Sequence, residues 1–89
     1  MTLKIKFFAY FRDLFGARER DLVLESAATV GGVLEVLTDT PERRAEVFAG
    51  AELKPHVVLL LNGAPPGRGL STPLADGDTL AIFPLLGGG

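Results

Sequence analysis

The stretch LKIKFFAYF, residues 3–11, decides the fold class that we expect. Its first half alternates, so that Leu3, Ile5 and Phe7 face one way while the lysines between them face the other. A period of two residues is typical of a β-strand with one buried face. A sheet that contains such a strand needs a second layer to cover its apolar side.

Three further segments have the character of strands: ERDLVLE (19–25), HVVLLLNG (56–63) and TLAIF (79–83). The connection at 12–18 is short and contains a glycine, which predicts an antiparallel hairpin between the first two strands. The run at 56–63 is mostly apolar, so we expect both of its faces to be covered, and Asn62-Gly63 indicates a tight turn at its end. The last strand should stop pairing after Phe83, because the next residue, Pro84, has no backbone N–H.

The covering layer is predicted between these strands, where the period of the sequence changes. Apolar residues recur with helical spacing at Val30, Val33, Leu34 and Leu37. Thr29 is the expected N-cap, and the helix should end near 39–40 because Pro41 disfavours helix in the residue before it. Pro41 then begins a short second helix that Gly50 would end.

This order predicts an α+β domain in which a mixed sheet of four or five strands packs on one main helix and a short second one. The last strand can lie beside the first in this sheet. At 89 residues the chain has room for one core. We therefore expect a folded domain at 1–83 and a flexible tail at 84–89.

Composition excludes several classes of function. There is no cysteine, so thiolate catalysis and cysteine-based metal sites are excluded, and His56, the only histidine, has no partner at a metal-ligand spacing. We expect it to be structural or solvent-facing. The basic pair Arg43–Arg44 reads as a solvated helix face rather than a nucleic-acid site. With no signal peptide and no long apolar run, the expectation is a soluble, cytoplasmic protein that contacts neither nucleic acid nor membrane.

The tail PLLGGG, residues 84–89, is the main functional candidate. Glycines without Cβ atoms can enter a channel too narrow for any side chain. The Gly89 carboxylate is a poor electrophile until it is activated, for instance as a mixed anhydride with AMP, and a frayed end is the alternative. Several large apolar residues are candidates for exposure: Phe8, Tyr10, Phe11, Phe15, Phe83, Leu85 and Leu86. They form either a protein interface or, for Phe11 and Phe15, a second small core.

Taken together, five features resemble the small subunit of molybdopterin synthase, the MoaD branch of the ubiquitin-like sulfur carriers. They are FFAYFRDLFG (7–16), TVGGVLEVL (29–37), LLLNG (59–63), LADGDTLAIFP (74–84) and the final Gly-Gly. The resemblance implies a β-grasp fold. It also implies that an E1-like enzyme uses ATP to adenylate Gly89, and that a sulfurtransferase then supplies sulfur to form a thiocarboxylate.

The resemblance also assigns roles to individual positions. Gly88 and Gly89 match the family's terminal pair, which enters the large subunit of molybdopterin synthase in a heterotetramer and donates sulfur to the pterin precursor of the molybdenum or tungsten cofactor. The implied partner-binding residues are Phe8, Pro65, Phe83, Pro84, Leu85, Leu86 and Gly87. The small subunit binds no cofactor or metal of its own in this reading.

Three other functions stay open at this point. With the same activated Gly89, the protein could be a sulfur carrier of the thiamine or tRNA type. It could also be a ubiquitin-like modifier whose Gly89 forms an isopeptide bond with a lysine. A plain β-grasp interaction domain with an idle tail is the third. Leu85, Leu86 and Gly87 depart from the prolines and small residue that commonly precede the glycines in the molybdopterin synthase subunit.

Overall fold

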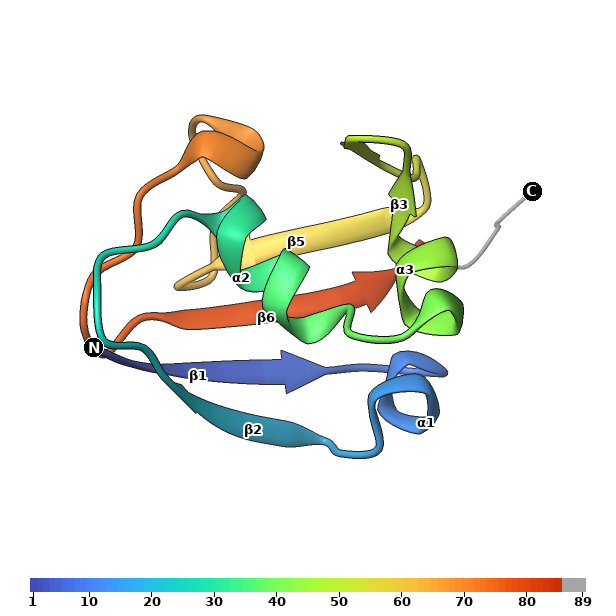
Figure 1. The fold of residues 1–89 in the computed structure, drawn as a ribbon, viewed down its shortest axis with the longest axis horizontal. Coiled ribbons are helices and arrows are strands. Elements are labelled where there is room, and N and C mark those ends of the chain that lie inside the picture. Colours follow the sequence, from blue (N-terminus) through green and yellow to red (C-terminus); the bar gives the residue numbers. More distant parts are fainter. Residues whose placement is uncertain (86–89) are drawn as a thin grey trace.

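The structure, a computed structural model, describes residues 1–85 and contains a sheet with helices packed on one face (Figure 1). The strands are β1 (Thr2–Phe7), β2 (Glu19–Val23), β3 (Phe48–Ala49), β4 (Glu52–Leu53), β5 (Val57–Leu61) and β6 (Thr79–Pro84). The helices are α1 (Phe11–Phe15), α2 (Val30–Leu37), α3 (Pro41–Val47) and the 3₁₀ turn η1 (Gly69–Ser71). The main sheet has the strand order β2-β1-β6-β5, and β3 pairs with β4 in a separate ribbon.

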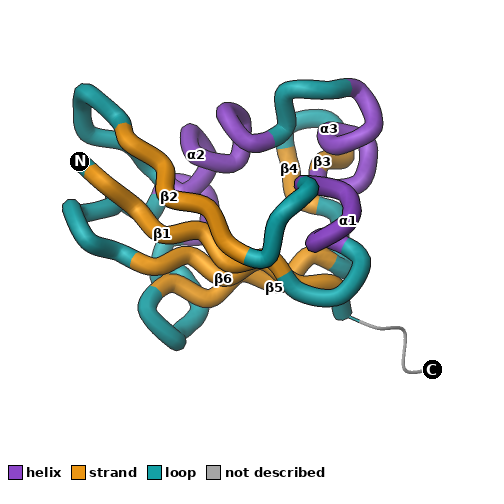
Figure 2. The backbone as a smooth tube through the Cα atoms, turned by 90° about the horizontal axis from the view of Figure 1, so that it is seen from below, coloured by secondary structure: helices purple, strands orange, loops and turns teal. Residues whose placement is uncertain are grey.

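The first and last strands lie side by side at the centre of the sheet, as expected. β1 runs antiparallel to β2 and parallel to β6, with Ile5 opposite Leu80, while β5 runs antiparallel to β6. Figure 2 shows α2 on one side of this sheet and α1 and α3 gathered near the end where the described chain stops. This arrangement is the β-grasp fold and confirms the predicted two-layer α+β class.

One continuous core joins the two layers. Leu3, Ile5 and Phe7 of β1 are 2%, 0% and 1% exposed, so the face predicted from the alternation of β1 is the buried one. The four apolar residues of α2 that share a helical face are fully buried against it. Burying side chains of this size stabilises the fold by about 1.5–3 kcal/mol each, which makes this contact the main source of stability.

The segment after β1 differs from the expected connection, because it contains helix α1. The chain turns at Ala9, whose φ of 53° lies in the left-handed region, and the helix follows from Phe11. Phe11 and Phe15 are four residues apart and therefore share one helical face, which is buried. Both residues join the common core rather than a second one, so they are not part of an exposed interface.

Both main helices begin where the sequence predicts and end earlier. The Thr29 hydroxyl accepts the Gly32 N–H at 3.1 Å, which confirms the N-cap of α2. The helix ends at Leu37 because the next residue, Thr38, leaves helical geometry with a ψ of 61°, and its hydroxyl donates to the Leu34 carbonyl at 2.8 Å. Gly50 does not end α3; with a φ of 66° it lies in the turn between β3 and β4.

The prediction that both faces of β5 are covered is wrong. β5 is an edge strand, and the helices cover only one face of the sheet, so Val57 and Leu59 are buried whereas Val58 and Leu60 are half-exposed. The predicted tight turn does follow it. Asn62 and its successor have φ values of 50° and 87°, as a two-residue hairpin turn requires.

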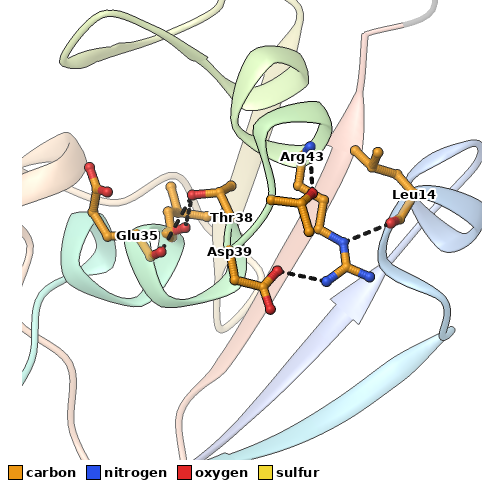
Figure 3. Close-up of polar contacts among 7 residues, drawn as sticks. Leu14, Glu35, Thr38, Asp39 and Arg43 are labelled. Carbon is orange, nitrogen blue, oxygen red and sulfur yellow. Dashed lines mark hydrogen bonds and ion pairs between the residues drawn. The ribbon is translucent and has the colours of Figure 1, made fainter.

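Arg43 links the helices at one end of the molecule, contrary to the expected solvated face (Figure 3). Its Nε donates to the Leu14 carbonyl of α1 at 3.0 Å, and its Nη1 lies 2.7 Å from the Asp39 carboxylate. The guanidinium also lies 5.6 Å from the centre of the Phe15 ring. Arg43 therefore holds α1, α3 and the link after α2 together, near the end of the sheet that β6 reaches.

Candidate functional site: the open face of the sheet and the end of β6

The candidate site starts on the face of the sheet that the helices leave open. Leu80 and Ile82 of β6 point into the core, so Phe83 between Ile82 and Pro84 points outward. Phe8 follows β1 on the same outward side, and its ring lies 5.7 Å from the Phe83 ring in an edge-to-face arrangement. The structure thus brings together two residues that the sequence assigned to partner binding.

The neighbouring strands extend this apolar surface. Val58 lies opposite Phe83, and Leu60 lies opposite Ala81, all on the open face and half-exposed. We call these residues, with Phe8, the Phe8–Phe83 patch. A contiguous apolar patch of this kind is typical of a protein–protein interface.

The patch has a basic rim and a shallow hollow. The Arg12 guanidinium lies 5.7 Å from the centre of the Phe8 ring, and Lys6 lies opposite Ala81 in the sheet. An apolar hollow of about 360 Å³ is lined by Phe8, Ala9, Phe83 and Pro84. The surface therefore suits a partner with an apolar protrusion and nearby carboxylates.

The first residues of the expected tail are still attached to the sheet. β6 continues to Pro84, which is buried and lies opposite Val57, one residue beyond the predicted end of pairing. Leu85 is 64% exposed, yet its N–H donates to the His56 carbonyl at 2.6 Å. The predicted site residues Leu86, Gly87, Gly88 and Gly89 lie outside the described residues.

Pro65 lies away from the other predicted contact residues. It is exposed and follows the hairpin turn after β5, where Leu61 lies opposite Leu80 near the start of β6. Phe83 lies near the other end of that strand. The structure therefore does not gather Pro65 with the Phe8–Phe83 patch.

A polar cluster that sequence reasoning missed lies beside the end of β6. Tyr10 Oη lies 2.8 Å from His56 Nε2 and 3.3 Å from Glu46 Oε2. Burial, and next the Glu46 carboxylate, raise the pKa of the Tyr10 phenol above its ordinary value. These contacts span 36 and 46 residues of sequence, so no local pattern could have indicated them.

The acidic turn DGD (76–78) has a structural role. The Asp78 carboxylate accepts the Ala75 N–H at 2.8 Å and the Asn62 amide at 2.9 Å, and these hydrogen bonds hold its pKa below the ordinary value. Asp76 accepts the N–H of Thr2 at 2.7 Å. Within residues 1–85, no three His, Asp or Glu side chains gather where they could hold a metal ion, and no helix is long and apolar enough to cross a membrane.

Comparison with protein families matches residues 5–89 to the ThiS family. The chain belongs to this family. Small archaeal modifier protein 3 of Haloferax volcanii is 37% identical over 92 residues, which cover 100% of both chains. The crystal structure of SAMP1 from Haloferax volcanii has a TM-score of 0.83 at 30% identity and also covers 100% of both.

A third match concerns the pathway that the sequence suggested. A solved structure from Pyrococcus furiosus, assigned as molybdopterin converting factor, subunit 1, has a TM-score of 0.74 at 27% identity and covers 94% of this chain and 97% of that one. The expected ThiS/MoaD relationship and β-grasp fold are therefore confirmed. Among the functions left open, the relatives named as modifier proteins match this chain at higher identity than the protein named for the molybdopterin pathway.

Proposed function

We propose that the protein is a ubiquitin-like modifier, whose Gly89 carboxyl group is activated and then joined to lysine side chains of other proteins. The observation that carries this proposal is the 37% identity with small archaeal modifier protein 3 over the full length of both chains. The Phe8–Phe83 patch supports it, since it supplies a docking surface beside the strand that leads to Gly89. This replaces the molybdopterin pathway as the main interpretation.

The chemistry needs two steps, neither of which uses a side chain of this protein. In the first, a Gly89 carboxylate oxygen attacks the α-phosphorus of ATP on an E1-like enzyme, and pyrophosphate leaves. In the second, a lysine amine attacks the carbonyl carbon of the adenylate, AMP leaves, a proton is released and an amide bond remains. The contribution of the domain is to present Gly89 in a fixed orientation, which is where such carriers gain rate.

The residues around the end of β6 would bind the activating enzyme. Phe8 and Phe83 offer a half-exposed apolar pair, and Arg12 and Lys6 beside them favour a partner surface with carboxylates. The exposed Leu85, followed by Leu86 and Gly87, would enter the enzyme together with Gly88 and Gly89. Pro65 would contact a partner only if that partner reaches the other end of β6.

A second function, sulfur transfer, is supported by the similarity to the Pyrococcus furiosus protein. Here the persulfide of a sulfurtransferase attacks the carbonyl carbon of the same acyl adenylate, AMP leaves, and an acyl disulfide forms. A second thiol then forms a disulfide with the sulfurtransferase sulfur, which releases Gly89 as a thiocarboxylate. The large subunit of molybdopterin synthase would take up this end in a heterotetramer. Both functions share the activated Gly89, so one protein could serve both.

Two readouts in one experiment separate these functions. The full chain with an N-terminal epitope tag is incubated with its E1-like enzyme, ATP and lysate, beside a variant that lacks Gly88 and Gly89. Tagged conjugates that need ATP and the two glycines support the modifier, and a mass increase equal to one oxygen replaced by sulfur supports the carrier. If neither appears and the enzyme releases no pyrophosphate, the protein is an interaction domain and the proposal is wrong.

A further inference from the structure

The cluster of Tyr10, Glu46 and His56, which we call the tail-root cluster, joins three elements at the end of β6. Tyr10 is the N-cap of α1, Glu46 lies in the last turn of α3, and His56 precedes β5. No step of the proposed function uses these side chains. Their arrangement nevertheless bears on the point at which the C-terminal residues leave the domain.

Tyr10 lies at the centre of the cluster and contacts both other side chains through its hydroxyl group. The Tyr10 hydroxyl lies 3.3 Å from the Glu46 carboxylate, which can only accept a hydrogen bond from it. The Tyr10 oxygen also lies 2.8 Å from His56 Nε2, where either atom can be the donor, depending on the tautomer of the imidazole. The imidazole also lies 6.3 Å from the buried Phe11 ring, centre to centre, so the His56 side chain is held on two sides.

The backbone of the same histidine holds the last described residue. The His56 carbonyl accepts the Leu85 N–H at 2.6 Å. Because Pro84 has no N–H, this bond is the one that fixes the chain just after β6. The side-chain contacts of the cluster and the hydrogen bond to Leu85 therefore meet in one residue, His56.

We propose that the tail-root cluster is a positioning device for the C-terminal residues, in which Tyr10 and Glu46 fix His56 and His56 fixes Leu85. The purpose of this device rests on the proposed function, because Gly89 is the group to be presented. Four residues follow Leu85 in the sequence and can span at most about 14 Å when extended. With so short a reach, a fixed starting point decides whether Gly89 meets the active site of the activating enzyme.

The test uses the full-length Tyr10→Phe variant, which removes the hydroxyl and keeps the ring against Phe11, 4.7 Å away between centres. Amide hydrogen exchange of Leu85 is measured by NMR, with the Ile82 amide as the reference for global stability. Losing one hydrogen bond that holds His56 should speed Leu85 exchange about five- to tenfold while Ile82 changes much less. The KM for adenylation, followed by pyrophosphate exchange, should rise about two- to fivefold at unchanged kcat.

Matched variants separate positioning from a general loss of structure. Glu46→Gln keeps an acceptor oxygen and should behave as wild type, whereas Glu46→Leu should behave as Tyr10→Phe. Ser71→Ala removes a hydroxyl hydrogen bond to the Arg68 carbonyl, 3.2 Å long, in η1 at the far end of the molecule, and should change neither readout (Figure 1).

Unchanged Leu85 exchange in Tyr10→Phe and Glu46→Leu would overturn the proposal. Faster exchange with an unchanged KM would also overturn it, since the cluster would then be structural only. If the wild-type chain is not adenylated at all, the proposed function fails. The exchange data alone then decide whether the cluster holds Leu85.

Discussion

Replacing Arg43 by alanine should destabilise the fold far more than the same change at Arg44, its neighbour in α3. The Arg43 side chain is only 26% exposed, and it donates to the Leu14 carbonyl at 3.0 Å and lies over the Phe15 ring. A hydrogen bond from a charged donor contributes about 1.5–3 kcal/mol, and the cation–π contact adds about 0.5–1 kcal/mol. We therefore expect Arg43→Ala to lower the free energy of unfolding by about 2–4 kcal/mol.

Urea unfolding followed by circular dichroism measures this difference, and Arg44→Ala is the matched control. The Arg44 side chain is 44% exposed, pairs with Glu35 and lies over Phe48, and at an exposed site each of these two contacts contributes at most about 1 kcal/mol. The midpoint should fall by roughly 1–2 M urea for Arg43→Ala and by less than about 1 M for Arg44→Ala. Equal losses in the two variants would refute the assignment of Arg43 as the link between helices.

A third variant separates the ion pair between Arg43 and Asp39 from the other contacts of Arg43. The Arg43 hydrogen bond holds the pKa of Asp39 below its ordinary value, but that carboxylate is exposed and screened by solvent. Asp39→Ala should therefore leave the urea midpoint almost unchanged. A loss as large as that of Arg43→Ala would mean that the pair with Asp39, and not the bond to Leu14, carries the stability.

Three further predictions follow from the open face and the turns. Phe83→Asp should weaken binding to the activating enzyme by about 30-fold or more, because an aromatic side chain buried in an interface contributes strongly to binding. Val23→Asp, at a 73% exposed position away from the patch, should leave the affinity unchanged. Titration calorimetry measures both affinities, and equal values would exclude the patch as the binding surface. Gly63→Ala should cost roughly 1 kcal/mol in urea unfolding because Gly63 has a φ of 87°, and no loss would contradict the assigned turn. Asp78 has a pKa lowered below 3.8 by its hydrogen bonds, so its contribution to stability is present above that pH and is lost as the pH falls through the folded-state pKa. Asp78→Asn should therefore be less stable than wild type near neutral pH, and its free energy of unfolding should decline less steeply below about pH 4. Urea unfolding at a series of pH values measures this, and parallel stability curves for the two proteins would contradict the prediction.

The predictions that succeeded depend on side-chain periodicity and on local chemistry. The alternation in β1, the helical spacing in α2, the Thr29 cap and the turn at Asn62-Gly63 each involve residues a few positions apart. Such signals are independent of the rest of the fold, so they can be interpreted before it is known. The order of elements then limits a chain of this length to few topologies, which is why the pairing of β1 with β6 was also predicted.

The predictions that failed depend on contacts between distant segments. Arg43 and Arg44 look equivalent in sequence, and only the position of α1 brings the Leu14 carbonyl within reach of one of them. Likewise, the apolar composition of β5 indicated two covered faces, yet its place at the edge of a sheet with one helical layer leaves Val58 half-exposed. Composition indicates that a strand is apolar, whereas the number of layers decides what covers it.

The segment after β1 shows how one backbone conformation can divide neighbouring residues between two roles. In a continued strand, Phe8 and Tyr10 would point to the same face, as their spacing of two suggested. Ala9 instead adopts a φ of 53°, which ends the strand and turns the chain into α1. Phe8 stays on the open face with Phe83, while Tyr10 reaches His56. A single left-handed residue thus places one aromatic side chain in the proposed partner surface and the other in the cluster that holds the end of β6.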